Sequence, residues 1–211
     1  MNITTFTRFH FVNAYLVPED DGLTLVDTTM NAAPQLLAAA ERLGAPIRRI
    51  ALTHGHGDHV GSLDALKERL GDVQVLMPEV DAQIHAGERE KTKGSWPTLK
   101  TVPDVRLSAG DRVGSLEVVA TPGHTPGHVS FLDTRDRTLI AGDVFTTYGG
   151  VATTSRFTLR FPFATMATED KEQNLESARA LRALEPTALL VGHGPIVRDP
   201  LAAIDRELEG K

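Results

Sequence analysis

The 211-residue sequence contains no cysteine. A chain without cysteine has no disulfide framework, no thiolate ligand for a metal ion and no thiol nucleophile. Thiol-dependent enzymes are therefore excluded, and so are metal sites that need a sulfur ligand. A protein without disulfides fits the reducing cytoplasm, and we expect a cytoplasmic location.

The sequence also lacks long apolar runs and basic tracts. No apolar run approaches the ~18 residues that a membrane-spanning helix needs. The first ten residues do not have the charged-then-apolar order of a signal peptide. The net charge is −6 at pH 7, which argues against a general nucleic-acid-binding surface. We therefore expect neither a membrane nor a nucleic acid as a partner, and the sequence carries no signal for an oligomeric state.

The composition is otherwise that of an ordinary globular protein. Hydrophobic residues make up 41% and charged residues 24% of the chain, close to average values. No linker or low-complexity segment interrupts the alternation of expected strands and helices. The length suffices for one well-buried core. We expect residues 1–211 to form a single α/β domain.

Residues 53–59 have the sequence THGHGDH, which is the most informative feature of the chain. Imidazole nitrogen and carboxylate oxygen are ligands that zinc and similar cations accept, and two interleaved glycines allow a tight bend. The segment 47–53 leads into this motif and predicts a strand, whereas residues 61–70 predict a helix. The motif would therefore lie on a strand-to-helix loop, where functional residues concentrate. Its four candidate ligands are His54, His56, Asp58 and His59.

Three further candidate ligands follow apolar runs in the same way. His124 comes after the run 116–120, Asp143 after 138–141 and His193 after 188–191. Loops at the ends of strands converge in α/β folds. Residues from distant parts of the chain can therefore share one site.

The ligand order His54-x-His56-x-Asp58-His59, then His124, Asp143 and His193, resembles that of the metallo-β-lactamase superfamily. The resemblance covers nearly the whole chain and begins at residues 13–17 and 25–28, which look like the opening hairpin of that family. It implies a four-layer αβ/βα sandwich, in which two mixed β-sheets pack face to face with helices outside. Periodicity alone predicts only an α/β fold.

The resemblance also implies the ligand assignments and the chemistry. One metal ion would be held by His54, His56 and His124, and a second by Asp58, His59 and His193, with Asp143 bridging them. Two such ions about 3.5–4 Å apart can share a hydroxide that attacks a substrate and can polarise the oxygen of the attacked group. Asp58 would act catalytically by accepting a proton and passing it to the leaving group. Zinc is the expected metal, and iron or manganese also suits these ligands.

Two neighbouring residues have more ambiguous roles. The repeat TPGHTPGH at 121–128 makes His124 and His128 locally equivalent. The family pattern selects His124 as the ligand, and we expect His128 to orient the loop or support a ligand by a hydrogen bond. Asp27 either supports the metal site or bonds its own backbone in a turn. His10 and His85 have no ligand context and are expected to be structural or solvated.

The expected activity is hydrolysis of a small ester, thioester or lactone. The chain lacks the ligand cysteine of true metallo-β-lactamases, and the bridging Asp143 resembles the glyoxalase II, lactonase and phosphodiesterase-like members. It ends 18 residues after His193, so we expect the helical glutathione-binding region of classical glyoxalase II to be missing. The alternatives are a phosphodiesterase and an iron-dependent oxidoreductase of the persulfide dioxygenase type. The mono-iron site of such an oxidoreductase would need fewer ligands than this chain carries.

The segment 144–165 is the expected substrate wall. It contains five of the few aromatic residues of the chain, and these rings would either line an apolar pocket or pin the loop to the core. Tyr148 is the expected substrate-binding residue, although its spacing from Asp143 departs from that of lactonases. Arg156 and Arg160 would clamp an anionic group or remain solvated. The five aromatic residues are Phe145, Tyr148, Phe157, Phe161 and Phe163.

Other local patterns predict the remaining elements. Helices are expected over 33–43, 167–184 and 200–209, the second with Thr168 as its N-cap. Residues 133–137 are expected to form a hairpin turn between two strands. The segments 88–103 and 144–165 give no clear assignment.

Overall fold

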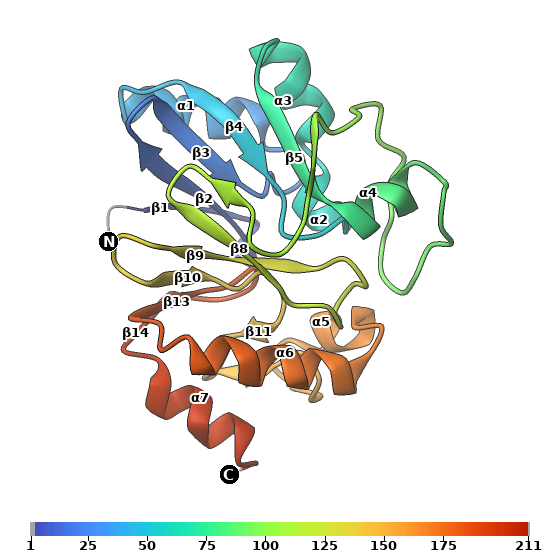
Figure 1. Cartoon of the computed structure of the whole chain (residues 1–211), viewed down its shortest axis with the longest axis vertical. Coiled ribbons are helices and arrows are strands. Elements are labelled where there is room, and N and C mark those ends of the chain that lie inside the picture. The colour runs from blue at the N-terminus through green and yellow to red at the C-terminus, as the bar shows by residue number, and fades with distance from the viewer. Residues whose placement is uncertain (1–2, 211) are drawn as a thin grey trace. The chain divides into compact units, whose positions relative to one another are not determined.

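The computed structural model describes residues 3–210, and these form two compact units. One unit consists of Met1–Lys91 and Ser95–Leu107, and the other of Thr92–Gly94 and Ser108–Lys211. Each contains one six-stranded sheet, and the second also contains a small two-stranded sheet. Figure 1 shows the strands and helices in chain order.

The sheet of the first unit has the order β1-β2-β3-β4-β5-β6. Its first three strands pair antiparallel, which confirms the expected opening hairpin, and β3 to β6 pair parallel. The strands β3, β4 and β5 therefore end at the same edge. The bounds are β1 Thr4–Arg8, β2 Val12–Glu19, β3 Gly22–Val26, β4 Ile47–Ala51, β5 Gln74–Pro78 and β6 Val105–Leu107.

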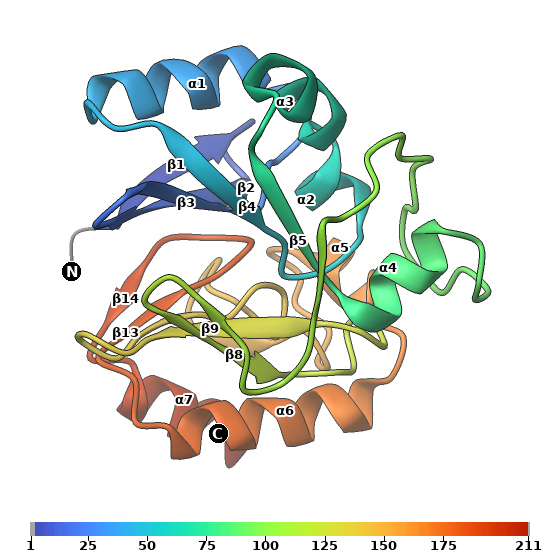
Figure 2. The same cartoon turned by 45° about the horizontal axis from the view of Figure 1, so that its top comes forward.

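The helices of the first unit are α1 Ala33–Arg42, α2 Gly57–Val60, α3 Leu63–Leu70 and α4 Glu79–His85. Helices α1 and α3 lie along one face of the sheet (Figure 2). Their buried residues, such as Leu36 and Leu66, join Leu25, Ile50 and Val75 of the strands in one hydrophobic core. Helix α1 agrees with the prediction for 33–43. The helix expected over 61–70 agrees with α3, and the structure adds a separate short helix, α2, which begins at Gly57 inside the histidine motif.

The sheet of the second unit has the order β14-β13-β10-β9-β8-β7. Strands β9 and β10 flank the turn expected at 133–137 and pair antiparallel, whereas β10 and β13 pair parallel. Because β8 pairs antiparallel with β9, it runs in the same direction as β10. The bounds are β7 Arg112–Val113, β8 Leu116–Ala120, β9 Val129–Asp133, β10 Thr138–Ile140, β13 Ala188–Leu190 and β14 Val197–Arg198.

The segment 144–167, which the sequence left unassigned up to residue 165, contains two short strands and a helix. They are β11 Phe145–Thr146, β12 Ala152–Thr153 and α5 Pro162–Ala167. Phe145 is fully buried in the core of this unit. It is therefore a core residue, which agrees with the second of the two roles weighed for the aromatic rings of this segment, that of pinning the loop to the core.

Two further helices, α6 Lys171–Ala183 and α7 Leu201–Leu208, lie against the second sheet (Figure 2). Ala178, Leu181 and Ile204 contribute to its core. The helix predicted over 167–184 starts later than expected. Asp170, not Thr168, is the N-cap, because its side chain accepts a hydrogen bond from the backbone N–H of Gln173.

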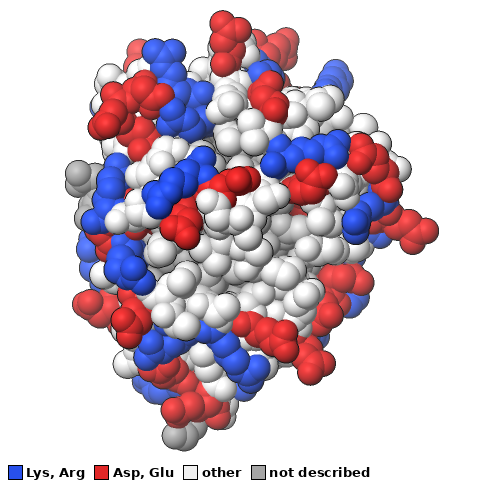
Figure 3. All heavy atoms as spheres, viewed as in Figure 1, with Lys and Arg blue, Asp and Glu red and all other residues white. Residues whose placement is uncertain are grey.

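Two further observations concern the surface charge and the helix lengths. Figure 3 shows acidic and basic side chains interspersed on the face in view, without a large region of one sign. Among residues 3–210, every helix is too short or too polar to cross a membrane.

Candidate functional site

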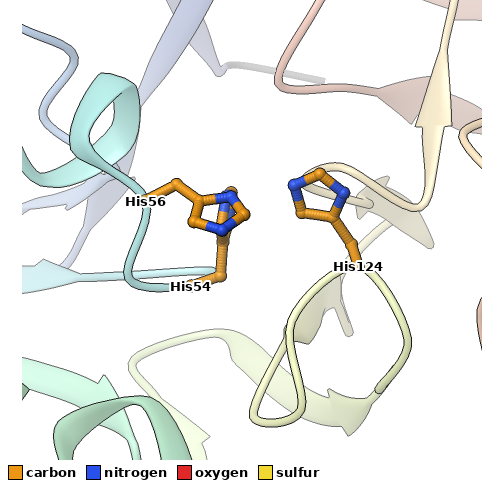
Figure 4. A group of neighbouring side chains, drawn as sticks. All are labelled: His54, His56 and His124. Carbon is orange, nitrogen blue, oxygen red and sulfur yellow. The ribbon is translucent and has the colours of Figure 1, made fainter. Parts of the chain in front are cut away.

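The histidine motif of the first unit begins where β4 ends. Strands β3, β4 and β5 run parallel, so the residues that follow them gather at one edge of the sheet. Figure 4 shows His54 directly after β4 and His56 further along the same loop. Candidate donor atoms of His54 and His56 lie within 4.8 Å of one another, as do those of His54 and His59. The ring centroids are 4.9 Å and 4.1 Å apart in these two pairs.

Asp27 organises this cluster from the end of β3. Its carboxylate accepts hydrogen bonds from the Thr53 backbone N–H at 2.8 Å and from the Thr53 hydroxyl at 2.9 Å. It also lies 2.9 Å from Nδ1 of His59. Asp27 is buried and has a left-handed backbone conformation, with φ at 59°. The supporting role weighed for Asp27 thus agrees with its contacts, since the bonds run to other residues and not to its own turn.

These contacts fix which nitrogen of each ring carries the proton. A carboxylate only accepts, so the Nδ1 of His59 donates to Asp27. The Thr53 hydroxyl donates to Asp27, and it therefore accepts from Nδ1 of His54, 3.0 Å away. In both histidines Nε2 is then the nitrogen that can bind a metal ion. Metal-binding histidines characteristically have this arrangement, with the second nitrogen held by a protein oxygen.

Asp58 and His59 lie on the short helix α2, one turn inside the motif. The Asp58 side chain is 28% exposed, whereas the ring of His59 is fully buried. Their facing atoms, Oδ2 of Asp58 and Nε2 of His59, are 3.8 Å apart. Among the seven candidate ligands, Asp58 alone is not buried, so it can exchange protons with water or substrate.

Helix α4 and the loop around Trp96 hold the backbone of the motif at Gly55. The Gly55 N–H donates to the fully buried carboxylate of Asp81 at 2.8 Å, and its carbonyl oxygen lies 2.8 Å from Nε2 of His85. The Trp96 ring packs edge-on against His56, with centroids 5.2 Å apart. A Cβ atom at position 55 would collide with the Trp96 ring and approach the His85 ring nitrogen to 2.7 Å. The motif therefore requires glycine here because of close packing.

The second unit places three candidate ligands after three strands that run in the same direction. Ile140 of β10 pairs with Leu190 of β13, and each strand is followed three residues later by a candidate ligand, Asp143 or His193. The two turns are joined by a hydrogen bond of 2.8 Å from Gly192 N–H to the Gly142 carbonyl oxygen. The paired strand ends thus explain why ligands fifty residues apart in sequence lie together.

His124 follows β8 on the TPGH loop, as Figure 4 shows. Its Nδ1 lies 2.9 Å from the hydroxyl of Thr168, which itself donates to the Ala164 carbonyl oxygen at 2.8 Å. The Thr168 hydroxyl therefore accepts from His124, and Nε2 is again the nitrogen that can bind a metal ion. Thr168 was expected to cap a helix, and its contacts instead support this histidine.

Asp143 is the point on which the histidines of this unit converge. Its Oδ2 lies 3.4 Å from Nε2 of His124 and 3.1 Å from Nε2 of His193, and all three side chains are buried. With His124 protonated at Nδ1, two electron-pair donors face each other in a region shielded from water. A cation bound to both would stabilise this arrangement.

His128, the second histidine of the repeat, has a different environment. Its Nε2 accepts a hydrogen bond of 3.0 Å from the backbone N–H of Asp143, and its Nδ1 lies 2.9 Å from the Thr121 hydroxyl. Both ring nitrogens are thus used by protein groups. The structure gives His128 a role in holding the backbone of Asp143, in agreement with the expected supporting role.

Tyr148 and the rings around it occupy the same unit. The Tyr148 ring lies 5.3 Å from that of Phe161, which in turn lies 4.5 Å from the ring of His193. Partial burial raises the pKa of the Tyr148 phenol, so the hydroxyl keeps its proton at neutral pH and can donate a hydrogen bond. Arg160 packs along Gly149, and the Nε of Arg156 lies 3.8 Å from Glu207.

Two residues of these surroundings, Asp81 and Trp96, could not be assigned a role from the sequence, and a third, Thr168, was assigned a different role. Asp81 and Trp96 contact the motif across 26 to 41 positions of sequence, and Thr168 contacts His124 across 44. Trp96 is the only tryptophan of the chain and lies in a polar loop, which is the one sequence signal that could have drawn attention to it.

Each unit therefore contributes histidine and aspartate side chains whose donor atoms lie close together, and several of these residues belong to groups that could hold a metal ion. The donor set of imidazole nitrogens and carboxylate oxygens suits zinc, iron and manganese alike. Neutral histidines whose Nδ1 is held by a protein oxygen fit this role. The residues present thus fit the metal ions that the motif implies.

Comparison with known proteins identifies the family. The family model described as Metallo-beta-lactamase superfamily matches residues 7–193. The Bacillus subtilis (strain 168) protein YobT, described as uncharacterized, is 40% identical over 94% of this chain and 89% of its own. The protein YybB of the same organism, described as a probable metallo-hydrolase, is 28% identical over 87% of this chain and 80% of its own.

A solved structure extends the similarity to the fold. The crystal structure of TTHA1623 in a di-iron-bound form superposes with a TM-score of 0.73 and 29% identity. The match covers 96% of this chain and 97% of that one. The two mixed sheets with their helices thus have the fold expected from the sequence.

Proposed function

This chain belongs to the metallo-β-lactamase superfamily, and on that premise we propose that it is a hydrolase that uses two metal ions to cleave a small ester, thioester or lactone. The observation that supports this most is the state of the histidines. His54, His59 and His124 each have Nδ1 held by a protein oxygen, which leaves Nε2 for a metal ion. The same arrangement in three histidines is what a set of metal ligands would show.

We assign the seven ligands as the family pattern implies. One ion would be bound by His54, His56 and His124, and the other by Asp58, His59 and His193. Asp143 would bridge the two, which is consistent with the short distances from its Oδ2 to two histidine Nε2 atoms in its own unit. Zinc is the metal we propose, with iron or manganese as alternatives that the same donors accept.

The chemistry that such ions supply is the acidification of a water molecule and the polarisation of the substrate oxygen. The protein side chains would complete the reaction. Asp58, the exposed carboxylate, would take the proton from the attacking water at a carboxylate oxygen. The water oxygen bonds to the acyl carbon, the C–O or C–S bond breaks, and Asp58 returns the proton to the leaving oxygen or sulfur.

Tyr148 is proposed to donate a hydrogen bond to the substrate carbonyl oxygen. Its phenol keeps its proton at neutral pH, because burial raises its pKa. Its ring contacts Phe161, which packs on the ring of the proposed ligand His193. We therefore propose a small molecule as the substrate. The cytoplasmic location is a separate prediction, which rests on the composition alone.

A substrate screen combined with metal analysis tests this proposal. Protein purified without added metal would be analysed for zinc, iron and manganese, and then assayed on lactones, thioesters, esters and phosphodiesters. Hydrolysis that disappears with a chelator and returns with the metal is the expected result. Turnover of phosphodiesters alone would identify the substrate class as wrong. Oxygen consumption on a persulfide, with one iron ion per chain and no hydrolysis, would replace the proposal by the dioxygenase reaction.

A further inference from the structure

The segment 157–166 exposes an unusual number of large apolar side chains. The described residues include seven large hydrophobic side chains that are exposed, and four of them lie in these ten positions. Leu159 is 90% and Phe163 69% exposed. Contiguous exposed apolar surface on a protein of ordinary composition commonly marks a binding site. The four residues, named here the apolar patch, are Phe157, Leu159, Phe163 and Met166.

The apolar patch belongs to a segment held in place by its own hydrogen bonds. The buried Thr165 donates to the carbonyl oxygen of Arg156 at 2.7 Å, and Thr158 donates to that of Phe161 at 3.1 Å. Phe163 and Met166 are three positions apart on α5, so they share one face of that helix. These side chains are thus exposed on a segment that is already folded. Binding of a ligand there would cost little conformational entropy.

A line of aromatic rings connects the apolar patch with a proposed metal ligand. The ring of Phe163 lies 5.8 Å from that of Phe161, which is only 8% exposed. Phe161 in turn packs 4.5 Å from His193 and 5.3 Å from Tyr148. Packed aromatic rings therefore lead from the patch to residues proposed to act on the substrate carbonyl. A partner protein or a membrane would not require this continuity, whereas the tail of a substrate would.

The charge pattern of the segment points to the same kind of ligand. Residues 144–168 contain no aspartate or glutamate, although the chain has 28 acidic residues, and their only charges are Arg156 and Arg160. Arg160 lies along the backbone of Gly149, with Nη1 2.8 Å from the position that a Cβ would take there. An apolar surface with arginine at its border and no carboxylate suits a hydrocarbon chain that ends in an acyl group or carboxylate.

We propose that the apolar patch binds the hydrocarbon chain of an acyl substrate, and of the carboxylate released from it. This inference rests on the proposed hydrolytic function and narrows its substrates to esters, thioesters or lactones that carry an extended alkyl chain. The acyl carbon would lie at Tyr148 and the proposed metal ligands, and the chain would extend over Phe161 toward Phe163 and Leu159.

Binding of carboxylates of two lengths tests the proposal without catalysis. Titration calorimetry would compare decanoate with butyrate on metal-free and on zinc-loaded protein. Burial of one methylene contributes up to about a fourfold gain in affinity, so even a partly covered chain should give a tenfold preference or more for decanoate. The variant Leu159→Ser/Phe163→Ser should lose most of this preference. Val102→Ser, which changes a side chain 77% exposed in the other unit, should retain it.

A series of p-nitrophenyl esters from acetate to octanoate provides the second readout. In the parent protein kcat/KM should rise with chain length. The loss of kcat/KM in Leu159→Ser/Phe163→Ser, relative to the parent protein, should grow with each added pair of carbon atoms. A loss that is equal for all chain lengths, or one that Val102→Ser shows as well, would overturn the proposal. Hydrolysis of acetate without any dependence on chain length would overturn it while leaving the hydrolase function intact. Decanoate binding without any hydrolysis would support the chain site and contradict the enzyme.

Two other occupants are distinguished by separate measurements. Sedimentation velocity would reveal a dimer that the double variant dissociates, and co-sedimentation with phosphatidylglycerol vesicles would reveal a lipid surface. Either result, together with equal affinity for butyrate and decanoate, would assign the apolar patch to that partner and overturn the proposal. A monomer that does not sediment with vesicles and prefers decanoate is the expected outcome.

Discussion

The two units supply their candidate ligands in contrasting ways. In the first, four ligands lie within six residues of sequence, on the loop that follows β4 and on the short helix α2. In the second, three ligands come from three strand ends spread over seventy residues. The first cluster is a local property of the chain, whereas the second exists only once β8, β10 and β13 have paired in one sheet. The ligands of the first unit can thus be recognised as a motif in the sequence. The ligands of the second unit come together only when its sheet folds.

The supporting contacts differ in the same sense. The histidines of the first unit depend on Asp27, Thr53 and the packing of Gly55 against Trp96. In the second, Thr168 holds His124 and His128 holds the backbone of Asp143. Substitutions in the two units should therefore distinguish residues that bind a metal ion from residues that hold a metal ligand in place.

The largest effect is expected from the TPGH repeat of the second unit. His124→Ala should remove a ligand, reduce metal content below two ions per chain and abolish most hydrolysis. His128→Ala should retain both ions, because both ring nitrogens of His128 are used by protein groups. Its metal affinity should fall on the order of 10–100-fold, since the backbone of Asp143 loses its support. Elemental analysis and metal titration check both variants. The reverse ranking would show that the ligand within the repeat is His128.

Tyr148→Phe is expected to have the next largest effect. The loss of one hydrogen-bond donor to a developing oxyanion costs on the order of 10²-fold in kcat. Because the ring and its packing on Phe161 are retained, folding and metal content should not change. Steady-state kinetics on the best substrate of the screen measures this. Full activity in Tyr148→Phe would make Tyr148 a packing residue and remove support for a second oxyanion donor.

Asp27→Asn tests the support in the first unit. The amide retains the size of the side chain and tolerates the left-handed backbone, but it weakens the hydrogen bonds to His59 and Thr53. Metal affinity should fall on the order of 10–100-fold, and the global fold should persist. Asp21→Asn is the matched control, since Asp21 pairs with Arg49 at the surface of the same unit. Equal metal affinities in the two variants would contradict the role of Asp27.

The smallest effect is expected at the glycines of the motif. Gly55→Ala would force its Cβ against Trp96 and His85, and overpacking of this kind costs about 1–3 kcal/mol. Gly57→Ala is the control on the same loop, because its nearest contacts, 3.2 Å to Ser95 Oγ and 3.4 Å to Pro97 Cδ, can relax. Chemical denaturation should give a lower free energy of unfolding for Gly55→Ala than for Gly57→Ala. Metal titration should likewise give a lower metal affinity for Gly55→Ala. Similar values for the two variants would show that the loop adjusts freely.

How far the sequence predicts the structure depends on whether a feature is local. The turn at 133–137 and helix α1 follow from patterns within a few residues, and the structure confirms them, as it confirms the opening hairpin that the family resemblance implied. The start of α6 was misplaced because Thr168 and Asp170 are both good capping residues. In the structure Asp170 caps the helix and the Thr168 hydroxyl contacts His124 instead. Local composition does not contain such a contact.

The same limit applies to the surroundings of the ligands. The seven candidate ligands were recognisable from residue type and spacing, whereas Asp81 and Trp96 became visible only through tertiary contacts with Gly55. The aromatic residues of 144–165 looked alike in sequence, yet Phe145 is fully buried and Phe163 is exposed. Burial depends on which strand pairs and which helix packs, so composition could not separate a core ring from a surface ring.

The central claim is that the two ligand clusters together hold two metal ions with Asp143 between them. A crystal structure with anomalous scattering, together with elemental analysis of the same protein after incubation with excess zinc, tests this most directly. The account predicts two ions per chain, one with His54, His56 and His124 and one with Asp58, His59 and His193, and Asp143 as a ligand of both. A fully occupied single site under excess metal, or two ions that do not share Asp143, would contradict it.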